Sequence, residues 1–319
     1  MNRFAEYLEK VKQDDAGKYD VNTPINRVRM NEGRLQGITN QQGHTTFHLT
    51  DWAMNQLCFK LGVPKKYMEK CPPALRDENI NHWLSQPDLK DEVKLRCKNN
   101  LVRGIVSDKY VPLDNGSVLG IANDLLDGKD IDIKNFDLSE QSFNMRLTFP
   151  RLTKDVSKSK VGDIVQCGVH IRNSEVGSSS VHVYALVFRL RCTNGLVSAG
   201  GDDEILNQRH IGIRMNELRS RFGESIGKAS KVGADMMERF IASQEIPVND
   251  PMKAIEDLAK ERFSDKFTDE IKSAFAVEPE SSRYGIVNAI TRASQTLKNM
   301  DDRVEVEQFA SKYLASRVA

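Results

Sequence analysis

The chain has 319 residues, of which 46 are Lys or Arg and 45 are Asp or Glu, so its formal net charge is +1. This length is enough for about two domains with a buried core. A composition that is 39% hydrophobic and 29% charged argues against wholesale disorder, a collagen-like repeat or a coiled coil. The near balance of charge excludes binding of nucleic acid by bulk charge, but it permits a local basic surface.

The cysteines and the apolar runs point to a cellular compartment. Five cysteines occur, at positions 58, 71, 97, 167 and 192. Their odd number, wide spacing and lack of a CxxC pair predict reduced thiols rather than a disulfide framework or a zinc site. The chain starts without the apolar core of a signal peptide, and no apolar run reaches about 18 residues. We therefore expect a cytoplasmic protein without a membrane partner.

Residues 1–92 are expected to form a mostly helical region that contains one hairpin. The polar residues 13–24 are expected to be an exposed connection. A strand pair with its turn at Asn31-Glu32-Gly33 follows. Helices are predicted at 3–12, 49–61, 65–71 and 74–85.

Residues 93–212 predict an α+β core around an antiparallel sheet. The run 101–113 indicates a hairpin with its turn near Ser107-Asp108. A helix follows at 116–126, with Ser117 as its cap. Further strands are predicted at 131–138, 142–149, 163–173 and 181–192.

Residues 213–319 are expected to be helical throughout. Apolar residues from Leu218 to Phe240 fall on one stripe of a long helix, about 214–243. Further helices are predicted near 251–263, 268–276, 284–297 and 302–317. The predicted fold class is therefore α+β, with a central antiparallel sheet, a mostly helical N-terminal layer and a helical C-terminal third.

The segment from Gly223 to Lys228 resembles a phosphate-binding loop only superficially. The spacing of its glycines is one residue short, and no Ser or Thr directly follows the lysine. The segment also lies inside a helical pattern instead of after a strand. We therefore expect no ATP hydrolysis and no nucleotide cofactor.

The histidines suggest a second class of function, a metal-dependent hydrolase or nuclease. His170 and His182 lie on successive predicted strands near Glu175, and Cys192 offers a nucleophile beside either histidine. No HExxH pattern occurs, and nothing positions a third catalytic group. Ordinary core histidines explain the pattern better, so no metal and no catalytic residue is predicted.

The segment from Gln56 to Tyr67 has the small residue, glycine and basic stretch of a helix-turn-helix. However, Pro72-Pro73 leaves the second helix under two turns long. An ordinary helical corner is therefore the favoured interpretation, and presentation of a helix to a DNA groove is the alternative.

Positive charge is concentrated in two stretches, 94–109 and 145–160, the second of which includes Lys158 and Lys160. On the last long strand, Arg189 and Arg191 are two residues apart and are expected to share a face. A row of cations on an exposed sheet would track phosphates, and nearby aromatic rings would stack on bases. The predicted nucleic-acid-binding residues are Lys98, Arg103, Lys109, Arg172, Arg189 and Arg191.

Two turns at the ends of the predicted strands carry polar side chains. Asn173 and Glu175 lie in the first turn, and Thr193 and Asn194 lie in the second. They form either a polar cluster at one end of the sheet or simply two structural turns. The turn interpretation is favoured on the residues alone.

Several motifs resemble the phage- and plasmid-related family built on domain of unknown function nine-three-two. The matching segments are RGIVSDKY at 103–110, NSEVG at 173–177, FRLRCTNGLV at 188–197 and VNAITRASQTL at 287–297. The resemblance spans about 100–315, whereas the first ninety residues match mainly through LGVPKKY. The family name implies no activity, but the resemblance implies an origin in a phage, prophage or plasmid.

At the level of strand and helix order, the family is also similar to the Rad-type single-strand annealing proteins of phages. That similarity implies rings or filaments that bind single strands without ATP. The leading hypothesis is therefore a protein that binds single-stranded DNA or RNA without ATP, in recombination or strand annealing. A binding protein is favoured over an enzyme. A homo-oligomer is expected. The alternatives are the hydrolase or nuclease above and an interaction protein that binds a host factor.

Overall fold

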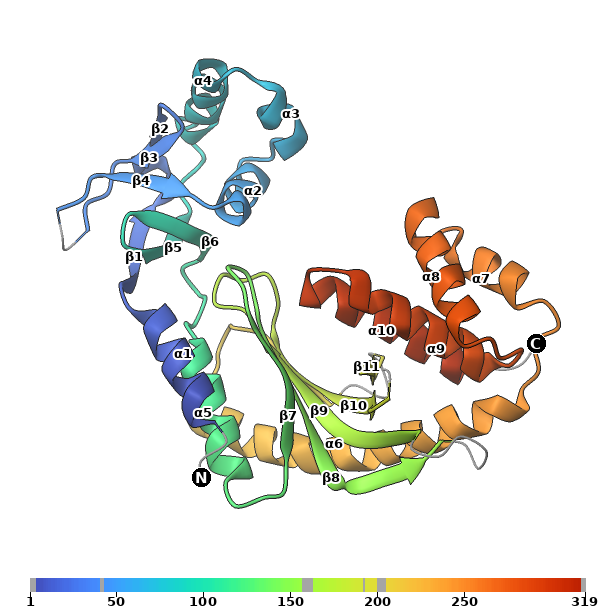
Figure 1. Cartoon of the computed structure of the whole chain (residues 1–319). Helices are drawn as coiled ribbons and strands as arrows, with labels where there is room; N and C mark the ends of the chain where they lie inside the picture. The colour runs from blue at the N-terminus through green and yellow to red at the C-terminus, as the bar shows by residue number, and fades with distance from the viewer. Residues whose placement is uncertain (1–3, 41–42, 157–162, 192, 200–204, 317–319) are drawn as a thin grey trace.

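The computed structural model contains two β-sheets, each covered by helices (Figure 1). The residues that the structure describes are 4–40, 43–156, 163–191, 193–199 and 205–316. The predicted α+β class is confirmed. Among the described helices, none has both the length and the apolar character that crossing a membrane requires.

The first sheet lies in the N-terminal part of the chain and has the strand order β1-β5-β6-β4-β3-β2. Of the described strand pairs in this sheet, only β4–β6 is parallel. Its strands are β1 (Lys18–Pro24), β2 (Arg29–Asn31), β3 (Arg34–Gln36), β4 (Thr46–Leu49), β5 (Glu92–Lys98) and β6 (Leu101–Ser107).

Four helices belong to the N-terminal part. The hydroxyl of Thr50 accepts from the backbone N of Ala53 and caps the first helix of the expected corner. The positive φ of Gly62 then reverses the chain before the next helix. The helices are α1 (Ala5–Asp15), α2 (Asp51–Lys60), α3 (Lys65–Lys70) and α4 (Pro73–Leu84).

Three expectations for this region need correction. Residues 18–24 form strand β1 instead of an exposed connection, because they pair along their whole length with β5. Residues 101–107 form a single strand that turns back at Asn99 onto β5, so 101–113 is not a hairpin by itself. The first sheet therefore extends past the boundary expected at 92/93. The hairpin around Glu32-Gly33 is confirmed, and both residues have positive φ.

The second sheet is antiparallel throughout and is the predicted central sheet. Its order is β11-β10-β9-β8-β7, and β12 pairs with β10 beside this path. Its strands are β7 (Asp132–Leu138), β8 (Phe143–Asp155), β9 (Ile164–Asn173), β10 (Val181–Arg189), β11 (Asn194–Val197) and β12 (Leu206–Gln208).

The two faces of this sheet differ in chemistry because side chains alternate along a strand. Phe143, Met145 and Leu147 point into an apolar core shared with α1, α5 and α6. Their neighbours Asn144 and Arg146 lie on the opposite face, where their side chains contact α10. One face is thus an ordinary core, and the other is polar and covered by a helix.

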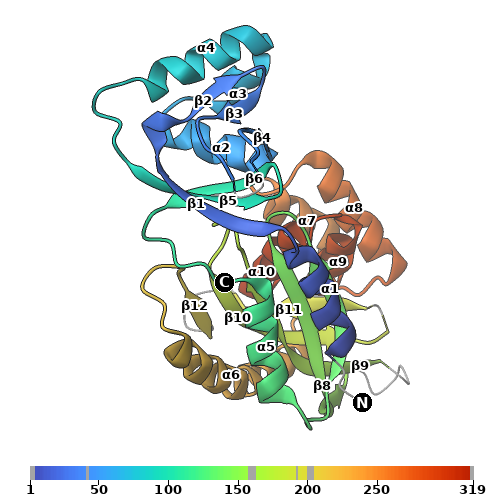
Figure 2. The same ribbon diagram turned by 90° about the vertical axis from the view of Figure 1, so that its left-hand side faces the viewer.

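The helices of the second part are those the sequence predicted, with shifted ends. Figure 2 shows α1 and α5 side by side, below the first sheet. Asp114, not Ser117, is the N-cap residue of α5. The helices are α5 (Asn115–Leu126), α6 (Met215–Ala242), α7 (Pro251–Ala259), α8 (Asp265–Val277), α9 (Arg283–Ala293) and α10 (Met300–Ala315).

The long helix α6 buries the expected apolar stripe, including Leu218, Phe222 and Phe240. Residues 223–228 lie within it, so the segment that resembles a phosphate-binding loop is helical backbone without a loop.

Candidate functional site

The six cations predicted to contact phosphates do not form one exposed row. Arg103 and Arg189 are buried, with only 7% and 2% of their surfaces exposed. Lys98 pairs with Asp14 at 2.8 Å. Arg172 is ion-paired with Asp301 at 3.0 Å. The remaining two cations, Lys109 and Arg191, are exposed in turns.

The register of the strands explains why the row does not form. Arg172 lies opposite His182, whereas Arg189 lies opposite Val165, so the two arginines are on opposite faces of the second sheet. Strand β10 ends at Arg189, and Arg191 lies in the turn beyond it. The predicted shared face of Arg189 and Arg191 is therefore wrong. Lys98 and Arg103 belong to the other sheet altogether.

Arg189 has a structural role. Its Nε donates to Oδ1 of Asp163 at 2.6 Å, and its Nη2 donates to Oε1 of Glu278 at 2.8 Å. Both acceptors are carboxylates, so the guanidinium is already neutralised by protein groups. Of the other predicted elements near this site, Lys158, Lys160 and Cys192 lie outside the described residues.

Glu175 is the centre of a buried ionic network between the two sheets. Its Oε2 accepts from Nζ of Lys18 and from Nη2 of Arg103, both at 2.8 Å. Its Oε1 accepts from the backbone N of Asn115, the first residue of α5, at 2.8 Å. Burial acts to raise the pKa of Glu175, but the charges of Lys18 and Arg103 hold it below its usual value.

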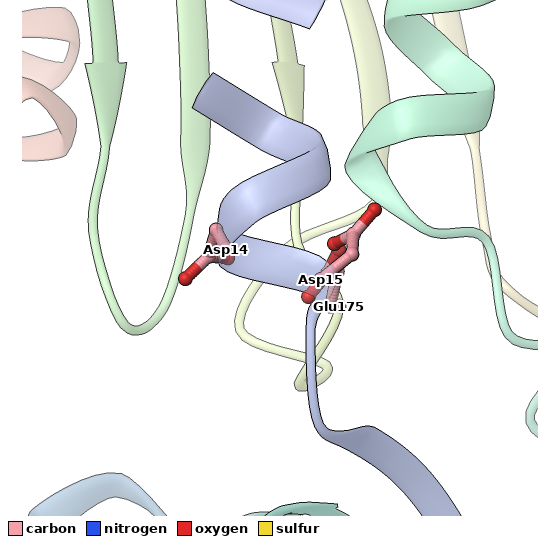
Figure 3. A group of neighbouring side chains, drawn as sticks. All are labelled: Asp14, Asp15 and Glu175. Carbon is pink, nitrogen blue, oxygen red and sulfur yellow. The ribbon is translucent and has the colours of Figure 1, made fainter. Parts of the chain in front are cut away.

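Asp14, Asp15 and Glu175 are close enough together to suggest a metal site (Figure 3). However, Nζ of Lys18 contacts all three carboxylates, at 2.5, 2.8 and 2.8 Å. The ammonium group of Lys18 supplies the positive charge that a metal would bring. The cluster is therefore explained as an ion-pair network that ties α1 to the turn after β9.

The polar cluster predicted from the two turns is divided between two places. The amide of Asn173 donates to Leu113 O at 3.0 Å and to Asn115 Oδ1 at 2.8 Å, near Glu175. The amide of Asn194 donates instead to Thr291 Oγ1 at 2.7 Å, in the C-terminal helices. Thr193 is exposed and has a φ of 53°. The two turns thus serve separate contacts.

His170 does not form a catalytic pair with Glu175. His170 is buried on β9, where Nδ1 accepts from Nε of Arg146 at 3.2 Å and Nε2 lies 2.9 Å from Oδ1 of Asn144. Burial, together with the charges of Arg146 and Arg172, lowers the pKa of His170 well below its usual value. These contacts engage both ring nitrogens and leave the hydrolase alternative without a general base there.

The polar face of the second sheet is covered by carboxylates from α10. Arg146 donates to both oxygens of Glu307, at 2.9 and 2.7 Å, and both side chains are buried. A Cβ on Gly195 would lie 3.1 Å from Nη1 of Arg146, so a glycine leaves room for this pair. Beside the pair is a cavity of about 370 Å³, bounded by β7, β8, β10 and α10.

The corner between α2 and α3 carries a different surface. Phe59 is 85% exposed and Tyr67 is 50% exposed, on a stretch that also contains four lysines. The two acids of this corner, Asp51 and Glu69, both pair with Lys65, at 2.5 and 3.2 Å. The sequence predicted a helical corner here, but it did not predict that the aromatic rings of the corner face solvent.

A comparison with protein families shows the family to which the chain belongs. The model of a family described as a domain of unknown function, DUF932, matches residues 102–291, more than half of the chain. The chain belongs to this family. No curated protein and no solved structure matches it. The DUF932 region includes Arg103, Glu175 and Arg189, whereas the α2–α3 corner and helix α10 lie outside it.

Proposed function

We propose that this protein binds single-stranded nucleic acid, without ATP hydrolysis, through the corner formed by residues 59–70. The supporting observation is the high exposure of Phe59 and Tyr67 beside lysines. Aromatic rings that face solvent offer stacking surfaces to unpaired bases, and lysines beside them contact phosphates. A helix-turn-helix function is not supported, because α3 is only six residues long.

The charge of the corner favours a polyanion. Lys65 pairs with both Asp51 and Glu69. No ion pair is found, within the part of the chain that the structure describes, for the other three lysines of the corner: Lys60, Lys66 and Lys70. Lys66 and Lys70 are also exposed. Of the six cations that the sequence predicted to bind nucleic acid, Lys109 and Arg191 are exposed, as a contact with phosphate requires.

The wider biological setting is part of the same proposal. We infer a role in recombination or strand annealing of a phage or plasmid, in the cytoplasm of a bacterial host and as a homo-oligomeric ring or filament. The motif resemblance supports this setting, because it implies a relation to phages or plasmids and a fold-level analogy to Rad-type annealing proteins. The helical backbone of residues 223–228 supports independence from ATP.

The test measures binding of a labelled oligothymidylate by fluorescence anisotropy between about 50 and 200 mM salt. Phe59→Ala should weaken binding about tenfold, because stacking of one base contributes about 1–3 kcal/mol. Lys66→Gln with Lys70→Gln should lower the slope of the logarithmic salt dependence by about 1.4. Met252→Ala and Lys312→Gln are the controls, since both residues are exposed on C-terminal helices.

Absence of binding at low salt, or an affinity that does not respond to salt, would overturn the proposal. So would a Phe59→Ala variant that binds like the wild type. Sedimentation of the same variant tests the competing interpretation. If Phe59→Ala changes the oligomeric state and leaves binding intact, the corner is a contact between copies of the chain.

A further inference from the structure

The cavity beside Arg146 and Glu307 is lined by an excess of positive charge. Three cations border it, from three different elements: Lys134 on β7, Arg146 on β8 and Arg303 on α10. Glu307 is the carboxylate among the described residues that line it. Since Arg146 holds both oxygens of Glu307, the described lining offers no second carboxylate to Lys134 and Arg303.

A local irregularity in the second sheet lets the side chain of Lys134 line this cavity. The pairing of β7 with β8 shifts register between Ile133 and Asn135, which makes Lys134 the extra residue of a β-bulge. Bulges redirect a side chain and are common beside functional sites. Nζ of Lys134 lies 5.9 Å from the centre of the Phe188 ring, which holds the ammonium by a cation–π contact. Its ion pair with Asp132 is long, at 3.4 Å, and Asp132 is half exposed.

Arg303 also keeps donors for a ligand. Its Nε donates to the backbone O of Leu297 at 2.6 Å, which fixes the guanidinium at the start of α10. Within the described chain, its two Nη atoms make no other hydrogen bond. A planar guanidinium that is held by one bond presents its remaining donors in the geometry that phosphate oxygens accept.

We propose that this cavity binds the terminal phosphate of a phosphate monoester, held by Lys134 and Arg303 beside the Arg146–Glu307 pair. A phosphate monoester carries a charge of about −1.5 to −2 at neutral pH, which matches the excess of two positive charges in the lining. The volume of about 370 Å³ is larger than a phosphate group alone and lies in the range of small-molecule sites. The other polar residues of the lining are Asn135, Thr193 and Gln295.

Two sources would bring the same chemistry, a free mononucleotide or the phosphorylated end of a nucleic-acid strand. The test therefore has two arms. Calorimetry measures binding of adenosine monophosphate, and anisotropy compares one oligonucleotide with and without a terminal phosphate. The variants are Lys134→Gln and Arg303→Gln, alone and combined, with Lys312→Gln on the same helix α10 as control. Arg146 and Glu307 are left intact because they support the fold.

The double variant should weaken binding of the phosphorylated ligand at least about tenfold, and Lys312→Gln should leave it unchanged. Loss in the calorimetric arm identifies a mononucleotide, and loss confined to the phosphorylated oligonucleotide identifies a strand end. The proposal is overturned if the wild type binds neither ligand through its phosphate at low salt, or if the folded double variant binds like the wild type.

This outcome is separable from that of the corner at residues 59–70. Phe59→Ala should bind adenosine monophosphate with wild-type affinity, because Phe59 does not line the cavity. Circular dichroism and the thermal midpoint establish that each variant is folded. If Lys134→Gln unfolds the chain, Arg303→Gln alone carries the test, since Arg303 is only partly buried.

Discussion

Arg103 on β6 and Glu175 in the turn after β9 form a buried ion pair that joins the two sheets. Nη2 of Arg103 lies 2.8 Å from Oε2 of Glu175, and both residues are buried. Lys18 completes the contact from β1. At this junction one buried carboxylate thus faces two cations.

Glu175→Gln should destabilise the protein by about 3 kcal/mol, because it leaves the buried charge of Arg103 without its carboxylate and removes one of the three carboxylates that face Lys18. Urea denaturation measures the change. The matched control is Glu238→Gln, which removes an exposed ion pair with Lys154 and should leave the midpoint unchanged. A variant of Glu175 that is as stable as the wild type would contradict a structural role for this carboxylate.

Two glycines of α6 should respond to alanine in opposite directions. Among the described residues, and apart from the helix's own backbone, nothing lies within 4 Å of a Cβ built on Gly227, whereas a Cβ on Gly233 would overlap Sγ of Cys167. Gly227→Ala should stabilise the helix by about 0.8 kcal/mol. Gly233→Ala should destabilise the protein by about 1–3 kcal/mol, because the buried side chain of Cys167 or the helix itself must shift to make room. Thermal unfolding checks both, and equal shifts of the same sign would refute the close approach.

Acid should destabilise the fold through buried histidines. Burial lowers the pKa of His210 from its ordinary 6.5 to about 4. Between these values the unfolded chain binds the proton and the folded chain does not, so stability falls as pH decreases. The contribution reaches about 1.4 kcal/mol per pH unit for each such histidine. Below about pH 4 the dependence on His210 ends.

Denaturation from about pH 7 to about pH 5 measures this slope. The range stays above the ordinary pKa of Glu175, 4.5, so that carboxylate does not titrate in it. His210→Gln should flatten the profile, whereas His82→Gln, on an exposed residue of α4, should leave it unchanged. An unchanged slope in His210→Gln would show that folding does not lower the pKa of this ring.

Arg189 and Arg191 should behave differently although they are two residues apart. Arg189→Ala removes the cation that faces Asp163 and Glu278 and should cost about 3 kcal/mol of unfolding free energy. Arg191→Ala, on an exposed turn, should change it by less than about 0.5 kcal/mol. Equal effects in urea denaturation would contradict the buried position of Arg189.

Local signals in the sequence were sufficient for much of the secondary structure. The stripe from Leu218 to Phe240 predicted α6, and strand-like runs predicted β7 to β10, because periodicity is a property of neighbouring residues. The short strands β11 and β12 were not predicted. Strand β1 was missed, since its pairing with β5 joins segments that are far apart in the chain. For the same reason, the turn of the β5–β6 hairpin was predicted near Ser107, whereas it lies at Asn99.

The sequence by itself determined the fold class, the long helix, the hairpin at Glu32-Gly33 and membership of the DUF932 family, the last through short motifs. Only the tertiary structure decided which charges are free. The sequence predicted Arg103 and Arg189 to be surface cations, whereas the structure pairs both with carboxylates from distant segments of the chain. The exposure of Phe59 was equally invisible, because whether a side chain is covered depends on packing between elements rather than on the residues next to it.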